Sequence, residues 1–382
     1  MRARKRVVTS VDRAAPAWPT RRERRAPGSR GAPGSRSAAT SQAGSGVQDL
    51  REGAGQGSVD AALACDLSVD LGRGLLLRNP VLVASGGMGY GVELDHAIVV
   101  EQLGAICTRG VTLRARTGNP PPRMARTPGG LLNGVGLQNP GLDAVLDRYA
   151  DAWARRPVPM IVNLAADSTA DFVELARRLE GVPGVAGLEL NLSCPNRGRG
   201  GIPFALEADA AGAVTAAVRR ATDLAMLVKL SPSASDPRTI ARAVADAGAD
   251  ALAAINTLPG LVVDADLRAP RRGAVQGGLS GPAIRPVALR VVHEVAGAVS
   301  IPVVAMGGVT TIADVLDFLA VGAAAVGVAT AALGDPGLPG GLSESLAAEC
   351  QRRGLDSYRA LIGTATTRCP GLSASRSAEY RL

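Results

Sequence analysis

One stretch, residues 188–196, places a thiol at the end of an expected strand. It reads Leu-Glu-Leu-Asn-Leu-Ser-Cys-Pro-Asn, and its leucines alternate with polar residues in the period of a β-strand. Pro195 has no N–H to donate to a neighbouring strand, so the strand ends before it. Cys194 therefore opens a loop at a strand end, where parallel α/β proteins place their reactive groups. The alternative is a buried structural cysteine, but the loop position and the polar neighbours favour a chemical role.

Polar side chains also stand at the ends of four apolar runs. They are Asn163, Asn191, Lys229 and Asn256. Amide groups donate and accept hydrogen bonds, so they suit a flat, polar, anionic heterocycle with ring amides and a carboxylate. A single asparagine is as well explained by capping of a helix or loop. Four such residues together with Cys194 favour a binding site.

Two further strand ends carry small residues that suit a phosphate group. Gly307-Gly308 follows the seventh apolar run, and Ala329-Thr330 follows the eighth. Backbone N–H groups beside a helix N-terminus bind anions, and barrel enzymes often hold phosphate at this place. The alternative is that the glycines only let the chain turn.

The elements that position these residues follow a repeating pattern of short apolar runs with helical segments between several of them. This pattern predicts an α/β fold, a (β/α)8 TIM barrel with insertions at its catalytic face. An open doubly wound sheet is the alternative, but eight regular runs without a glycine fingerprint after the first favour the barrel. The runs are residues 81–84, 105–108, 159–162, 188–190, 226–228, 251–255, 303–306 and 325–328, and the clearest helices are 170–179, 209–221 and 240–247.

Other segments fall outside this repeat. Residues 66–77 are expected to form a hairpin that closes one end of the barrel. Connections 112–158 and 257–279 are too long for simple loops and are expected to build the pocket or a partner surface. We expect three regions: a disordered basic extension over 1–58, the barrel over 59–356 with its last helix near 343–353, and a C-terminal tail over 357–382.

Composition limits the possible functions. Residues 1–48 carry a net charge of +9, whereas the remainder holds 31 basic and 32 acidic residues, so nucleic-acid binding by the folded part is not expected. Five scattered cysteines without a Cys-x-x-Cys pair indicate neither a disulfide framework nor a metal site and fit a reducing, cytoplasmic compartment. Only two histidines are present, which makes cysteine the better candidate for a base. No apolar run is long enough to span a membrane.

The Asn-Leu-Ser-Cys-Pro-Asn stretch resembles the active-site signature of class 1 dihydroorotate dehydrogenases. Its continuation, Asn-Arg-Gly-Arg-Gly-Gly, is most similar to the catalytic subunit of the NAD-linked class 1B. Gly-Asn-Pro-Pro-Pro-Arg at 118–123 and Gly-Leu-Gln-Asn-Pro-Gly at 136–141 also resemble that family, and the likeness runs from about residue 67 to about residue 354. Class 2 enzymes, which are membrane-bound and quinone-linked, carry serine at the cysteine position.

This resemblance implies FMN-dependent oxidation of (S)-dihydroorotate to orotate in pyrimidine (UMP) biosynthesis. Cys194 would take a proton from C5 while a hydride leaves C6 for flavin N5. The implied cofactor-binding residues are Ser85, Arg109, Gly110, Asn163, Asn191, Lys229, Ile255, Gly281, Gly307, Gly308, Ala329 and Thr330. The implied substrate-binding residues are Arg109, Asn133, Gly134, Val135, Gly136, Leu137, Asn191, Asn196, Asn256 and Thr257.

Three positions depart from the family pattern. Thr108-Arg109-Gly110 stands where the family has Thr-Lys-Gly, Ala329-Thr330 where it has Gly-Thr, and Ser85-Gly86-Gly87-Met88 where it has Ser-Gly-Thr-Phe. A guanidinium is larger than an ammonium and donates in a planar fork, so the first change bears on rate or substrate identity. We expect the small Gly87 to make room for it.

The resemblance also implies partners. These are dihydroorotate and orotate, a second copy of the chain, and an FAD and 2Fe–2S subunit that would complete a heterotetramer and pass electrons to NAD. Two alternatives remain open. One is a related flavoenzyme acting on another dihydropyrimidine or ring substrate. Dihydropyrimidine dehydrogenases resemble this barrel, but histidine is expected in them at the position of Asn196, so Asn196 favours dihydroorotate. The other is a drifted, non-catalytic flavin-binding or flavin-free subunit.

Overall fold

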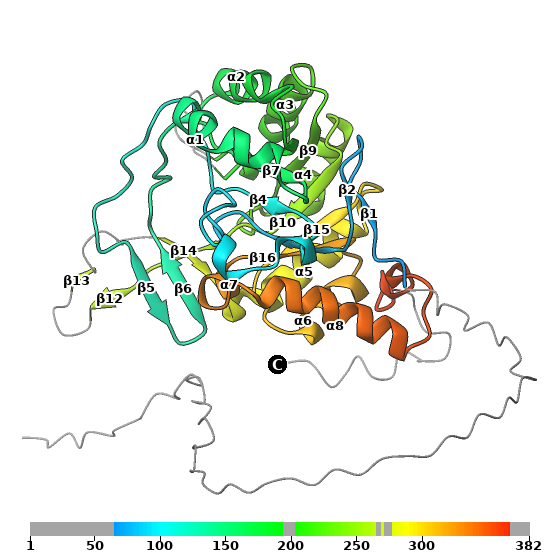
Figure 1. The fold of residues 1–382 in the computed structure, drawn as a ribbon. Coiled ribbons are helices and arrows are strands. Elements are labelled where there is room, and N and C mark those ends of the chain that lie inside the picture. The colour runs from blue at the N-terminus through cyan, green and yellow to red at the C-terminus, as the bar shows by residue number, and fades with distance from the viewer. Residues whose placement is uncertain (1–64, 194–202, 265–268, 271–276, 367–382) are drawn as a thin grey trace, which may run out of the picture. The chain divides into compact units, whose positions relative to one another are not determined.

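Eight parallel strands close into a barrel in the order in which they occur along the chain (Figure 1). The computed structural model describes residues 65–193, 203–264, 269–270 and 277–366. The barrel strands are β3 (Val81–Val83), β4 (Ile106–Cys107), β7 (Met160–Leu164), β8 (Val185–Asn191), β9 (Ala225–Lys229), β10 (Ala251–Ala254), β15 (Val303–Met306) and β16 (Ala325–Val328). All eight apolar runs predicted from the sequence are barrel strands, so the predicted fold class is confirmed and the open sheet is excluded.

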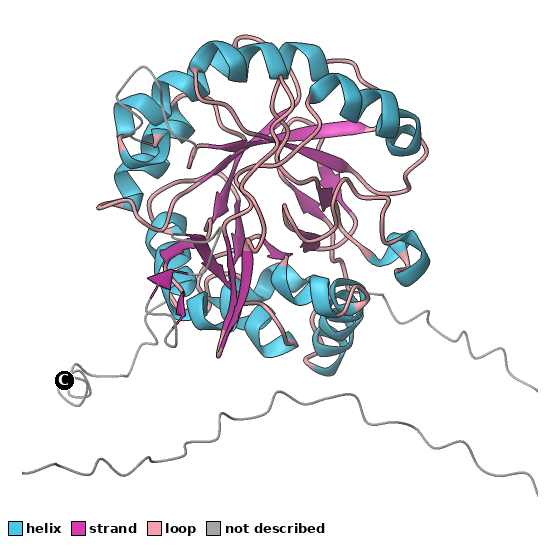
Figure 2. Ribbon diagram, turned by 90° about the vertical axis from the view of Figure 1, so that its left-hand side faces the viewer, coloured by secondary structure: helices cyan, strands magenta, loops and turns pink. Residues whose placement is uncertain are grey.

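The helices lie outside the strands (Figure 2). They are α1 (Leu142–Ala154), α2 (Thr169–Leu179), α3 (Ala208–Arg219), α4 (Pro237–Asp246), α5 (Arg285–Ala296), α6 (Ile312–Ala320), α7 (Thr330–Gly334) and α8 (Leu338–Arg352). Every residue of β7, β9, β10, β15 and β16 is buried, as expected for parallel strands covered on both faces. Small Ala and Val residues fill this interior, which explains how a chain with only 2% aromatic residues builds a core.

Side-chain caps fix where several helices begin. Ser168 Oγ accepts from the backbone N–H of Asp171 at the start of α2, and Thr311 and Asp314 form a reciprocal capping box at the start of α6. Helix α8 begins five residues before the expected 343, and Pro339 lies in its first turn, where proline is favoured because its missing N–H has no helical partner there. No helix among the described residues has the length and apolar character needed to cross a membrane.

The two long insertions, which are far apart in sequence, meet in one antiparallel sheet. Its order is β11 (Leu258–Gly260), β14 (Gly277–Ser280), β6 (Gly130–Asn133) and β5 (Met124–Thr127). Figure 1 shows β5, β6 and β14 side by side at one end of the barrel. A separate pair, β12 (Val263–Asp264) and β13 (Ala269–Pro270), belongs to the second insertion. The sequence predicted two insertions but not that they pair with each other.

The predicted N-terminal hairpin is present as β1 (Val69–Asp70) and β2 (Leu76–Leu77). Asp66, just before it, pairs with Ser357 near the C-terminus. The 3-10 helix η6 (Tyr358–Leu361) follows, and the buried Tyr358 donates its hydroxyl to the Ala324 carbonyl at 2.9 Å. Residues 357–366, which we expected to start the tail, thus pack on the barrel because Tyr358 and Leu361 supply apolar anchors.

We expect Gly130→Ala and Gly341→Ala to change stability in opposite directions. A Cβ on Gly130 would lie 1.9 Å from the Ser280 carbonyl oxygen across the insertion sheet, so the free energy of unfolding should fall by roughly 1–3 kcal/mol. A Cβ on Gly341 inside α8 meets nothing within 4 Å, so alanine there should raise it by about 0.5–1 kcal/mol. Denaturant unfolding of both variants measures this, and equal effects would contradict the sheet pairing.

Candidate active site

A buried polar network joins five residues near the carboxyl ends of the barrel strands. Lys229, the last residue of β9, donates from Nζ to Ser85 Oγ at 2.8 Å and lies 3.4 Å from Glu189 Oε1. Asn163 Nδ2 donates to the same Glu189 oxygen at 2.5 Å, and the Asn163 backbone N–H donates to Thr108 Oγ1. Strands β9 and β3 are opposite each other in the closed order, so the bond from Lys229 to Ser85 crosses the barrel interior.

This network holds two opposite charges almost without contact with solvent. Glu189 is 1% exposed and Lys229 is 5% exposed. A lone ion in such a place would cost several kcal/mol, whereas a hydrogen-bonded pair offsets much of that cost. The pair therefore allows a barrel lined by Ala, Val and Leu to present an ammonium at its mouth.

Cys107 lies on β4 in the same interior and is fully buried. Burial raises the pKa of the Cys107 thiol well above its usual value, and the Glu189 carboxylate raises it further. Cys107 therefore stays a neutral thiol and is unsuited to act as a base.

An amide cluster lies beside this network. Asn191 Oδ1 accepts from Asn256 Nδ2 at 3.0 Å and from the backbone N–H of Ser193 at 3.3 Å. Asn133, on β6 of the insertion sheet, donates to the Gly278 carbonyl at 3.2 Å, and a Cβ on Gly278 would lie 2.2 Å from Thr257 Oγ1. The insertion sheet thus brings two of the predicted residues, Asn133 and Thr257, to the strand ends that carry the other two.

The predicted loop 134–137 is held by Asn119, which lies in the Gly-Asn-Pro-Pro-Pro-Arg segment. Asn119 Nδ2 donates to the Gly134 carbonyl at 2.8 Å, and its backbone N–H donates to the Val135 carbonyl at 3.0 Å. Gly136 and Leu137 have φ values of +72° and +55°. A non-glycine residue such as Leu137 seldom adopts this left-handed conformation, so the surrounding contacts determine the shape of the loop.

Arg109 is fixed by contacts on this same side of the barrel. Its Nη2 donates to the Gln138 carbonyl at 2.7 Å, and its guanidinium lies 6.0 Å from the centre of the Tyr90 ring. Burial raises the pKa of Tyr90 to about 12, so the ring stays a neutral phenol beneath the cation. Gln138 belongs to the insertion, so Arg109 ties a barrel strand end to the loop.

Gly87 does not make the room that we expected for Arg109. The atoms nearest to a Cβ at Gly87 belong to Val83, Ala84 and Ala329, at 3.0–3.1 Å. Two of the departures from the family pattern, Gly87 and Ala329, are therefore neighbours. The extra bulk of Arg109 is taken up instead by the Tyr90 ring and the Gln138 carbonyl.

Three glycines form a backbone cradle at the last strand ends. Gly281, Gly307 and Gly308 all have positive φ values, of +97°, +124° and +86°. A Cβ on Gly308 would lie 3.0 Å from the Gly281 carbonyl oxygen and 2.7 Å from Arg285 Cβ, so only glycine fits. Ile255 packs beside Gly307, and Ala329 and Thr330 form the start of α7. This arrangement can accept a phosphate through backbone N–H groups.

The structure therefore brings most of the predicted residues to one end of the barrel. Cys194 and Asn196 lie outside the described residues, and the roles of all predicted site residues stay predictions. The sequence analysis missed Glu189, Thr108 and Tyr90. Glu189 could have been found, because a carboxylate inside a strand that is buried on both faces needs a partner. Among the described residues, no group of three His, Cys, Asp or Glu residues could hold a metal ion.

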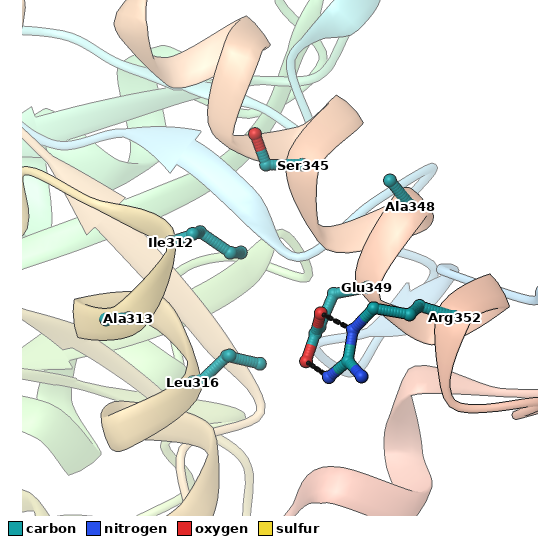
Figure 3. A pocket seen from close by; sticks show the side chains of 7 residues that line it. All are labelled: Ile312, Ala313, Leu316, Ser345, Ala348, Glu349 and Arg352. Atoms are coloured by element: carbon teal, nitrogen blue, oxygen red, sulfur yellow. Dashed lines mark hydrogen bonds and ion pairs between the residues drawn. The ribbon is translucent and has the colours of Figure 1, made fainter.

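A second groove on the molecule lacks the polar residues that make the strand ends a candidate active site. It lies between α6 and α8 on the outside of the barrel (Figure 3). Glu349 and Arg352 on its rim pair with each other at 2.6 Å. Its lining contains none of the polar residues at the strand ends and consists of Ile312, Ala313, Leu316, Ser345, Ala348, Glu349 and Arg352.

Comparison with known proteins identifies the family. The family model described as dihydroorotate dehydrogenase matches residues 69–348. The catalytic subunit of dihydroorotate dehydrogenase B (NAD(+)) from Desulforudis audaxviator is 47% identical over 292 residues, covering 76% of this chain and 95% of the relative. The proteins of that name from Pelobacter propionicus and Geobacter sulfurreducens are each 45% identical over 298 residues, covering 78% of this chain and 98% and 97% of the relatives.

Lys229→Met should destabilise the protein, because it leaves the Glu189 carboxylate buried without its cation. We expect the free energy of unfolding at neutral pH to fall by about 3–5 kcal/mol. The matched control is Arg238→Met, since Arg238 pairs with Asp236 at 3.1 Å on the surface and should change it by less than ~1 kcal/mol. Denaturant unfolding of both variants measures this. Similar decreases in the free energy of unfolding would show that the buried pair stabilises the protein no more than the surface pair does.

Proposed function

Because the chain belongs to the dihydroorotate dehydrogenase family, we propose that it uses bound FMN to oxidise (S)-dihydroorotate to orotate in pyrimidine biosynthesis. The observation that carries this proposal is the amide cluster of Asn133, Asn191 and Asn256 beside the buried Lys229. Amides can match the alternating donors and acceptors of a dihydropyrimidine ring. A neighbouring ammonium favours an anion and an electron-rich cofactor.

FMN fits the residues at the strand ends. Gly281, Gly307 and Gly308 have positive φ values and neighbours too close for a Cβ, so the chain turns there as only glycine can, and such turns can direct backbone N–H groups to a phosphate. Ser85, Asn163 and Lys229 offer a hydroxyl, an amide and an ammonium from opposite sides of the barrel. When bound, FMN would supply an acceptor for the hydride that leaves C6 of the substrate.

Residues of this chain would bind the substrate and remove its proton. Asn133, Asn191, Asn256 and Thr257 would hold the ring, with the loop 134–137 covering it. Cys194, by resemblance, would take the proton from C5 as the C5–H bond breaks. It directly follows Ser193, whose backbone N–H donates to Asn191 Oδ1, so the residue before Cys194 lies beside the amide cluster.

We further propose that a separate subunit carries electrons to NAD. The relatives are named as catalytic subunits of an NAD(+)-linked enzyme. This sequence has no Gly-x-Gly-x-x-Gly after its first strand and no cysteine cluster for an iron–sulfur centre. A partner with FAD and a 2Fe–2S cluster, joined to a dimer of this chain, would supply both.

The direct test is anaerobic mixing of the purified protein with dihydroorotate. The flavin absorbance near 450 nm, a general property of oxidised flavins, should bleach. If the protein carries flavin but the flavin is bleached only by another dihydropyrimidine, that compound would take the place of dihydroorotate as the proposed substrate. A protein that binds no flavin would reject the proposal.

Cys194→Ser should bind FMN normally but be reduced slowly by dihydroorotate at neutral pH. A hydroxyl is a far weaker base than a thiolate, and general base catalysis is worth roughly 10²–10⁴-fold. Stopped-flow reduction of the flavin measures the rate. Cys107→Ser is the control, because the buried neutral Cys107 thiol has no proposed part in the proton transfer. An unchanged rate in Cys194→Ser would remove Cys194 from the mechanism.

Arg109→Lys should raise kcat/KM for dihydroorotate measured with an artificial electron acceptor. The guanidinium donates to the Gln138 carbonyl and lies against the Tyr90 ring, so these contacts leave fewer of its N–H groups for the substrate. A lysine keeps the charge and frees space. If Arg109→Lys is inactive while the parent is fast, arginine is an adapted part of the site.

A further inference from the structure

Glu189 is a buried carboxylate to which the proposed reaction gives no task. It lies inside the barrel on β8, and its Oε1 accepts from Asn163 Nδ2 and lies 3.4 Å from Lys229 Nζ. Asn163 and Glu189 are direct neighbours across β7 and β8, and Lys229 lies across from Asn191, two residues further along β8. One oxygen thus contacts two of the groups that are proposed to meet the flavin, the Asn163 amide and the Lys229 ammonium.

A negative charge at this place works against the rest of the site. The proposed cofactor gains electrons and the proposed substrate is an anion, so Lys229 alone would favour both. Glu189 cancels much of that charge in an interior where water cannot screen it. Its influence reaches a third strand, since Glu189 is the second cause, after burial, of the raised pKa of Cys107 on β4.

We propose that Glu189 is a positioning residue that holds Lys229 and Asn163 in place and, through its charge, lowers the reduction potential of the bound flavin. This rests on the proposed flavin site. Neutralising the ammonium makes the reduced flavin less favourable, and the reduced flavin then gives up its electrons more readily. A lowered flavin reduction potential suits a catalytic subunit that must pass its electrons to an acceptor of low reduction potential.

The test is the midpoint potential of the flavin in Glu189→Gln, measured anaerobically by equilibration with a reference dye. Glutamine keeps the oxygen that accepts from Lys229 and Asn163 but removes the charge. The potential should become more positive, so that the ratio of reduced to oxidised flavin at a fixed reference potential rises about tenfold, comparable to removing one charge beside a titrating group. Lys229→Met should move it in the opposite direction. A mere structural disturbance has no reason to give opposite signs.

Asp250→Asn is the matched control. Asp250 is also a part-buried carboxylate with ionic partners, Arg219 at 2.9 Å and Arg73 at 3.2 Å, but it precedes β10 at the other end of the barrel. Its loss should leave the potential unchanged.

If Glu189→Gln does not fold, the double variant Glu189→Gln with Lys229→Met replaces the ion pair by a neutral pair. It should return the potential towards that of the parent. An unchanged or more negative potential in Glu189→Gln, or a double variant that differs from the parent as much as Lys229→Met does, would overturn the proposal. Flavin that is absent from the parent protein would instead reject the proposed function.

Discussion

The ion pair between Lys229 and Glu189 is the constraint on which the site depends. In a barrel filled by small aliphatic side chains, a lone ammonium at 5% exposure would be costly, and the ion pair offsets much of that cost. The pair is completed from two further strands, by Ser85 across the barrel and Asn163 beside it. Every barrel strand that supplies this network must therefore keep its register, since a slip of one residue turns its polar group out of the interior.

The insertion sheet gives the site its second half. Strands from residues 124–133 and 258–280 pair with each other, although more than a hundred residues separate them. Glycine at 130, 277 and 278 lets the strands and Thr257 approach closely. The result is that Asn133 from one insertion and Thr257 from the other reach the same edge as Asn191 and Asn256.

How far the sequence predicted this site depends on the range of each interaction. The eight barrel strands follow from local patterns of apolar residues, and the strand-end asparagines follow from counting along those strands. The pairing of the two insertions is a contact between distant segments, and no local pattern encodes it. The place of Arg109 depends on Tyr90 and Gln138, which come from two different loops, so the expectation that Gly87 would make room for it was wrong.

We propose that the amide cluster would hold an anionic ring next to a flavin held in part by the Lys229 ammonium. A crystal structure of the FMN-loaded protein with orotate tests this most directly. We expect the orotate ring to be hydrogen-bonded by Asn133, Asn191 and Asn256, and the Lys229 ammonium to contact the flavin while keeping Glu189 as its partner. Orotate bound away from these amides, or a flavin that does not contact Lys229, would contradict it.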